Sequence, residues 1–128
     1  MGLIQHPTNS ISERVIGAAI EVHRQLGPGL LESSYQTCLC RELDLRRTSY
    51  QSQLVLPIDY KGVHLSKGYI IDLLVENAVV VEIKSIDTVL PIHLSQLMTY
   101  MRLRGISSGL LLNFNVQFLH QGIKRLLL

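Results

Sequence analysis

The chain has 128 residues, enough for one domain with a substantial core. Hydrophobic residues make up 47% and charged residues 17%, a balance that excludes an intrinsically disordered chain. A net charge of +2 is too small to indicate nucleic-acid binding by itself. The N-terminus lacks the basic start and apolar run of a signal peptide, and no apolar stretch reaches membrane-spanning length. We therefore expect a cytoplasmic protein that does not contact a membrane.

Two helices are predicted in the first third of the chain. Ser10 or Ser12 can cap the first helix, and apolar residues at helical spacing continue to the Gly-Pro-Gly break at 27–29. A second helix is expected from about 31 to 43, because its apolar residues form one stripe. Residues 1–10 are expected to be a flexible segment of a single domain that covers the whole chain.

Strands and one more helix are predicted in the rest of the chain. In chain order these elements are strands at 50–58, 63–75 and 78–84, a helix at 92–104, and strands at 107–112 and 122–127. Glu76-Asn77 supplies a turn between two of the strands, Pro91 begins the helix, and Gly105 ends it. A helix between two apolar strands fits a right-handed crossover between parallel strands.

Two acids and a lysine are predicted to converge on one hairpin. Side chains alternate along a strand, so Glu82 and Lys84 point the same way. Antiparallel pairing around the turn would bring Asp72 close to both. The alternative is an ion pair on an exposed edge strand, but the four apolar residues 78–81 favour a buried central strand. Buried charge needs a partner or a metal ion, so this cluster indicates a functional site.

The spacing D-x9-E-x-K resembles the signature of the PD-(D/E)xK nucleases, with Asp72, Glu82 and Lys84 in its three roles. The proline that usually precedes the aspartate is replaced by Ile71. The resemblance implies a restriction-endonuclease-like α/β fold. Its core has the order α-β-β-β-α-β, with a mixed central sheet flanked by helices.

Two further motifs carry the same resemblance. Residues 29–35 read G-x-x-E-x-x-Y, and residues 96–100 read Q-x-x-x-Y, a pattern typical of RecB-like nucleases. From about Ile11 to Leu127 the chain is similar to the small GxxExxY proteins of the superfamily. The resemblance implies a nuclease that hydrolyses phosphodiester bonds, in DNA more than in RNA, with Mg²⁺ or Mn²⁺ as its cofactor.

The same resemblance assigns roles to individual residues. Asp72, Glu82 and the carbonyl of Ile83 are expected to bind the metal ion, with Glu32 as a further ligand, directly or through water. Oxygen donors of this kind suit Mg²⁺. Lys84 is expected to polarise the scissile phosphate or to hold the attacking water.

Four other residues are expected to support the site. Gln96 is expected to orient the site or the substrate strand, and Tyr100 shares its helix face. Their alternative role is ordinary helix packing. Tyr35 either holds the site through its hydroxyl or packs in the core. His23 is either a metal ligand or a histidine stabilised by the dipole at a helix C-terminus.

Two other functions remain open from the sequence. The chain could be a catalytically silent module that binds nucleic acid or protein on the same fold, because fold does not fix function. It could also be a nuclease subunit that needs a protein partner or a second copy of itself. The intact set of Asp72, Glu82, Lys84 and Gln96 argues against a silent site.

Overall fold

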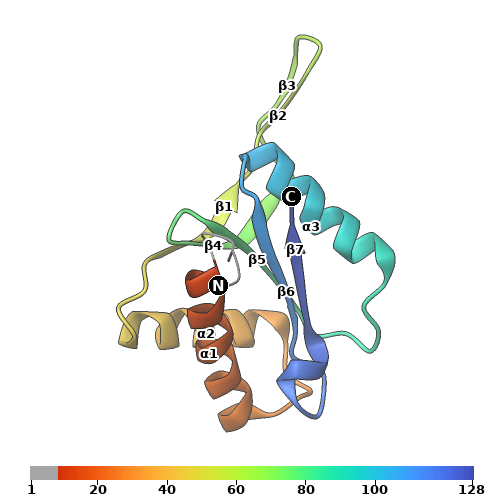
Figure 1. The fold of residues 1–128 in the computed structure, drawn as a ribbon. Coiled ribbons are helices and arrows are strands. Elements are labelled where there is room, and N and C mark those ends of the chain that lie inside the picture. Colours follow the sequence, from red (N-terminus) through yellow and green to blue (C-terminus); the bar gives the residue numbers. More distant parts are fainter. Residues whose placement is uncertain (1–8) are drawn as a thin grey trace, which may run out of the picture.

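The computed structural model describes residues 9–128 (Figure 1). The elements are α1 (Asn9–Leu26), α2 (Glu32–Leu45), β1 (Tyr50–Val55), β2 (Ile58–Tyr60), β3 (Val63–Leu65), β4 (Ile70–Val75), β5 (Val79–Lys84), α3 (Pro91–Arg104), β6 (Ser108–Asn113), the 3-10 helix η1 (Leu119–Gly122) and β7 (Ile123–Leu127). The expectation for residues 1–10 falls mostly outside the described residues, but Asn9 and Ser10 already belong to α1. None of the helices described over 9–128 has both the length and the apolar character to cross a membrane.

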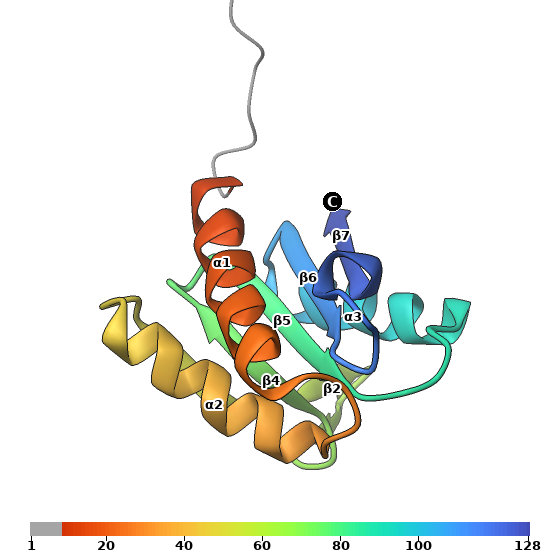
Figure 2. The same cartoon turned by 90° about the horizontal axis from the view of Figure 1, so that it is seen from below.

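Five strands form one mixed sheet in the order β1-β4-β5-β6-β7. Only β5 and β6 pair in parallel, and α3 connects them as the predicted crossover helix. Helices α1 and α2 lie on one side of the sheet and α3 lies on the other (Figure 2). This arrangement confirms the predicted α/β fold with helices around a mixed central sheet.

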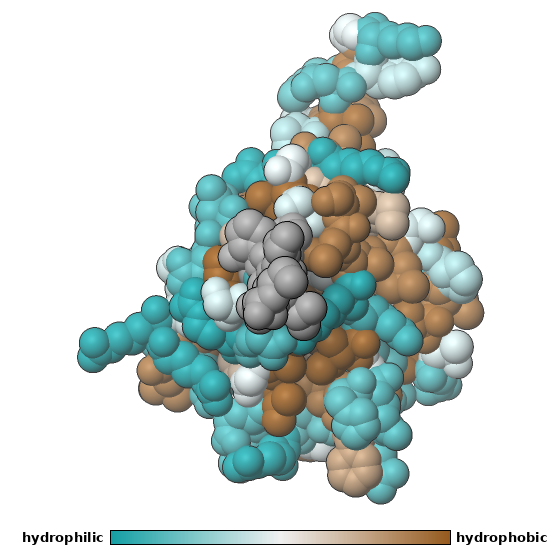
Figure 3. Space-filling view, viewed as in Figure 1, coloured by the Kyte–Doolittle hydropathy of each residue, from teal (hydrophilic) through white to brown (hydrophobic). Residues whose placement is uncertain are grey.

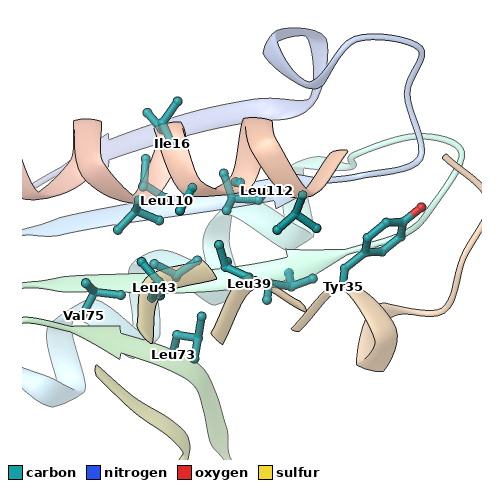
Figure 4. Packing of buried hydrophobic residues seen from close by; sticks show 14 of the residues in the cluster. Ile16, Tyr35, Leu39, Leu43, Leu73, Val75, Leu110 and Leu112 are labelled. Carbon is teal, nitrogen blue, oxygen red and sulfur yellow. The ribbon is translucent and has the colours of Figure 1, made fainter. Parts of the chain in front are cut away.

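The larger core lies between the sheet and the first two helices. Alternate residues of β5, among them Val79, Val81 and Ile83, point into it and are almost fully buried. Side chains from α1 and α2 pack against them (Figure 4). The residues between, such as Val80, point to a second core beneath α3. Because both faces of β5 are covered, its sequence is continuously apolar up to the acid of the site.

The turn at Glu76-Asn77 joins β4 to β5, as predicted. Both residues have positive φ values, 52° and 53°, which suits a two-residue turn between antiparallel strands. The amide of Ala78 donates to the carbonyl of Val75 at 3.0 Å. This tight connection sets the register that places Leu73 opposite Val81.

The predicted strands at 50–58 and 63–75 are wrong in their boundaries. β1 ends at Val55, just ahead of Pro57, which has no N–H to donate to a ladder. The stretch expected to be one strand from 63 is interrupted before β4, where Gly68 takes a φ of 104°. Between these breaks, β2 and β3 pair only with each other and form a separate two-stranded sheet.

The close approach of Gly122 to β6 gives a stability prediction. A Cβ at Gly122 would lie 2.0 Å from the main-chain oxygen of Asn113, so Gly122→Ala should destabilise the protein by about 1–3 kcal/mol. Gly17 is the matched control, because its Cβ would meet only the end of the Arg46 side chain, at 3.3 Å. Gly17→Ala should be neutral or stabilising by up to about 1 kcal/mol, since alanine favours helix. Urea unfolding measures both, and equal effects of the two changes would contradict the packing described.

Candidate active site

The candidate site lies where the two central strands separate. The pairing of β4 with β5 ends at Leu73 and Val81. Beyond that point β4 pairs with β1, through Ile71, and β5 continues along β6. Asp72 and Glu82 therefore face each other across a gap in the sheet, in the predicted register.

Each carboxylate accepts a hydrogen bond from the main chain of the opposite strand. The amide of Ile83 donates to Oδ2 of Asp72 at 2.8 Å, and the amide of Asp72 donates to Oε1 of Glu82 at 3.3 Å. These bonds replace the backbone pairing that the strands give up. They satisfy buried N–H groups that would otherwise be costly.

Both acids have pKa values above those of ordinary carboxyl groups. Glu82 is 6% exposed. Burial, followed by the charge of Asp72, raises its pKa from 4.5 to about 8. Burial also raises the pKa of Asp72, although the Ile83 amide and the nearby Lys84 ammonium oppose the shift. With a pKa of about 8, the Glu82 carboxyl keeps its proton at neutral pH. A proton therefore removes part of the negative charge of the site when no cation is bound.

Lys84 and the main chain of Ile83 also face the site. The positive charge of Lys84 lowers the pKa of both acids, so the three charged groups do converge. The Lys84 carbonyl accepts from the Phe114 amide at 2.9 Å, on the β6 side. Since successive carbonyls of a strand point to opposite neighbours, the Ile83 carbonyl points towards β4, into the gap.

Glu32 lies at the first position of α2 and reaches the end of β5. Its Oε1 accepts a hydrogen bond from the Ser85 amide at 3.3 Å. The hydroxyl of Ser85 donates to the Leu30 carbonyl at 2.6 Å, which ties the start of α2 to the same place. The charge of Glu32 raises the pKa of Asp72. Glu32 thus adds negative charge beside Asp72 and Glu82.

The tyrosine of the G-x-x-E-x-x-Y motif anchors this loop. The hydroxyl of Tyr35 donates to the Gly27 carbonyl at 2.5 Å and accepts from the Leu30 amide at 3.1 Å. Its ring stacks on Phe114 with 4.4 Å between centroids, so the side chain is buried and only its hydroxyl end faces the loop (Figure 4). Tyr35 therefore does both things left open by the sequence: it packs in the core and holds the loop that presents Glu32.

Gln96 and Tyr100 border the site from α3. The Gln96 amide donates to the Tyr100 hydroxyl at 3.0 Å. Burial and then the negative charge of Glu82 raise the pKa of Tyr100, which places its hydroxyl near the two acids. Gln96 and Tyr100 therefore border the site on the α3 side of the sheet.

His23 contacts the segment that follows β6. Its Nε2 lies 2.8 Å from the carbonyl of Val116, and its ring packs near Phe114. These contacts give the buried histidine a structural partner at the C-terminal end of α1.

The site also includes residues that the motifs did not identify. Gln36 donates to the main-chain carbonyl of Asp72 at 3.3 Å and accepts from Gln53 at 2.9 Å. Asn113 is buried and bonds the amide and the carbonyl of Ile86, which holds the chain just after β5. A polar residue at the end of an apolar strand was the only signal for Asn113. For Gln36 the sequence carries none beyond its place after Tyr35.

The donor set suits a hard divalent cation that keeps part of its water shell. Over the described part of the chain, 9–128, no group of three or more His, Cys, Asp or Glu side chains is placed to hold a metal ion. The buried carboxyl of Glu82 and the half-buried carboxyl of Asp72 nevertheless adjoin the gap into which the Ile83 carbonyl points. Magnesium is commonly held by one or two carboxylates together with water and substrate phosphate oxygens. The proton that Glu82 retains marks where positive charge is needed.

The raised pKa of Glu82 predicts a pH-dependent stability in the metal-free protein. The folded state binds this proton more tightly than the unfolded state, so its stabilising effect is complete below pH 4.5 and is lost as pH rises through about 8. Between these values the wild type, in chelator, should lose more than about 1.4 kcal/mol relative to Glu82→Gln. Denaturant unfolding from pH 4.5 to 8.5 measures the difference. Parallel pH profiles for the two proteins would contradict the raised pKa of Glu82.

Comparison with known proteins agrees with this geometry. A family model described as the PD-(D/E)XK nuclease superfamily matches residues 9–126. Searches of curated proteins and of solved structures gave no match. Members of the superfamily generally use divalent metal ions, and their substrates are nucleic acids. Since the match spans most of the chain, this protein belongs to the PD-(D/E)XK nuclease superfamily.

Proposed function

We propose that this protein is a nuclease of the GxxExxY group that hydrolyses phosphodiester bonds in DNA with Mg²⁺ or Mn²⁺. One observation carries the proposal: the buried carboxyl of Glu82 and the half-buried carboxyl of Asp72 lie across a gap between two strands, each bonded to the main chain of the opposite strand, and Lys84 lies near both. A structural ion pair with Lys84 would need only one acid, whereas this site has two. The whole chain, 1–128, is proposed to act as one domain.

The acids of the site are proposed to bind the metal ion. Asp72 and Glu82 would hold the cation in place of the proton that Glu82 retains, and the Ile83 carbonyl would supply a neutral oxygen. Glu32 sits beside them, where it can hold a water of the metal shell while its Oε1 stays on the Ser85 amide. When bound, a divalent ion neutralises phosphate charge and lowers the pKa of a bound water.

The remaining residues position the substrate. Lys84 lies on the same face as Glu82, where its ammonium can hold the scissile phosphate or the attacking water. Charge placed in advance at this point stabilises the transition state more than the ground state. Gln96 and Tyr100 present an amide and a hydroxyl on the α3 side, which suit contacts to the substrate strand.

Paired measurements of cleavage and metal affinity test the proposal. Labelled single-stranded, double-stranded and branched DNA is incubated with Mg²⁺, Mn²⁺ or chelator, and metal affinity is taken from the metal-dependent rise in melting temperature. The proteins are the wild type, Lys84→Ala, Glu82→Ala and the control Lys124→Ala. Lys124 is an exposed residue on β7, at the far edge of the sheet.

The wild type and the control should cleave only when metal is present. Lys84→Ala should bind metal as the wild type does and cleave roughly 10²–10³-fold more slowly, because only transition-state stabilisation is lost. Glu82→Ala should lose both metal binding and cleavage. Cleavage that resists chelator, or that stays at full rate in Lys84→Ala, would contradict the mechanism. Metal binding without any cleavage in the wild type would favour the silent module.

A further inference from the structure

A hairpin arm, residues 56–69, stands out from the body of the protein (Figures 1 and 3). It consists of β2 and β3 and a tight turn at Lys61-Gly62, whose φ values are 45° and 88°. Positive φ at both turn positions matches the twist of a two-residue hairpin. An isolated two-stranded hairpin is only marginally stable in water. An exposed arm of this kind therefore needs a function or a partner.

The two faces of the arm differ in character. Cross-strand pairs share a face, so Ile58 with Leu65 and Tyr60 with Val63 form one apolar face. Tyr60 is 63% exposed and Val63 is 57% exposed. The opposite face carries Asp59 and His64, which pair at 2.5 Å.

The arm carries positive charge where the site carries negative charge. The only acid of the arm, Asp59, is paired with His64. Lys61 at the tip and Lys67 on the returning segment are exposed, and neither forms an ion pair within residues 9–128. The ammonium of Lys61 lies 5.3 Å from the centre of the Tyr60 ring. Cations beside exposed aromatic and apolar side chains are the chemistry that binds nucleic acid.

The arm is continuous with the candidate site. At its base, the Leu56 amide donates to the Tyr69 carbonyl at 2.8 Å. Leu56 is buried beneath α3 in the cluster that contains Tyr100. Tyr69 is 39% exposed and lies near enough to Tyr100 to affect its titration, and Asp72 follows three residues later. A polyanion held at the site would therefore pass the base of the arm.

We propose that the arm enters a groove of double-helical nucleic acid and holds the duplex next to the scissile phosphate. This inference rests on the proposed function and specifies its substrate. A two-stranded β-ribbon has the width that the major groove of B-DNA admits, and apolar side chains can contact thymine methyl groups there. Lys61 and Lys67 would meet the phosphates that border the groove. The two exposed lysines, neither of which forms an ion pair within 9–128, favour a polyanion over a second copy of this chain as the occupant.

Binding of labelled DNA in chelator, where cleavage is absent, tests the inference. Fluorescence anisotropy compares a duplex with a single strand of the same sequence, for the wild type, Lys61→Glu, Tyr60→Ser and the matched control Lys124→Glu. Lys61→Glu should weaken duplex binding by roughly tenfold and reduce the salt slope by about 1. Tyr60→Ser should weaken duplex binding too, whereas Lys124→Glu should change it by less than about twofold.

Three results would overturn the inference while leaving the nuclease proposal intact, provided that the wild type cleaves DNA. The first is an equal loss of affinity in Lys61→Glu and Lys124→Glu. The second is tighter binding of the single strand than of the duplex. The third is a wild-type dimer in sedimentation that Val63→Asp converts to a monomer with unchanged DNA affinity, which would make the arm a dimer contact. A wild type that neither binds nor cleaves DNA would refute both proposals.

Discussion

The exchange of hydrogen bonds at the split between β4 and β5 is the constraint on which the rest of the structure depends. The Ile83 amide donates to Asp72, and the Asp72 amide donates to Glu82, so each strand satisfies the other without a regular ladder. The exchange holds two acids at close range, and burial, complete for Glu82 and partial for Asp72, raises the pKa of both. A proton or a cation must then occupy the gap, and the fold provides no other neutralising group except Lys84 in the described part of the chain.

The surrounding elements keep this gap in place from three directions. Tyr35 and Ser85 tie the loop before α2 to the end of β5, which presents Glu32. Asn113 fixes the segment after β5 through Ile86. On the opposite face, Tyr100 packs in the second core, its hydroxyl accepts from Gln96, and the charge of Glu82 contributes to its raised pKa. Residues of both motifs, Glu32 and Tyr35 on one side and Gln96 and Tyr100 on the other, thus surround the gap.

The sequence predicted the parts of the structure that follow from periodicity and close spacing. The turn at Glu76-Asn77 fixed the register, and the register placed Asp72 opposite Glu82. The arm was missed because 50–58 and 63–75 were each expected to be one strand, whereas the breaks at Pro57 and Gly68 divide each of them between the main sheet and the arm. The contacts of Gln36 and Asn113 depend on which elements become neighbours, and a single sequence does not report this. The raised pKa of Glu82 likewise arises first from burial, which depends on how distant segments pack.

The central claim is that the two acids exchange their proton for a divalent cation. Crystals grown with Mn²⁺ and measured at the manganese absorption edge test this claim most directly, because anomalous scattering locates the ion without relying on activity. The account predicts one strong peak in the gap, within bonding distance of Asp72 and Glu82, and no such peak in crystals of Glu82→Ala. A peak elsewhere on the molecule with an empty gap, or an unchanged peak in the variant, would contradict it.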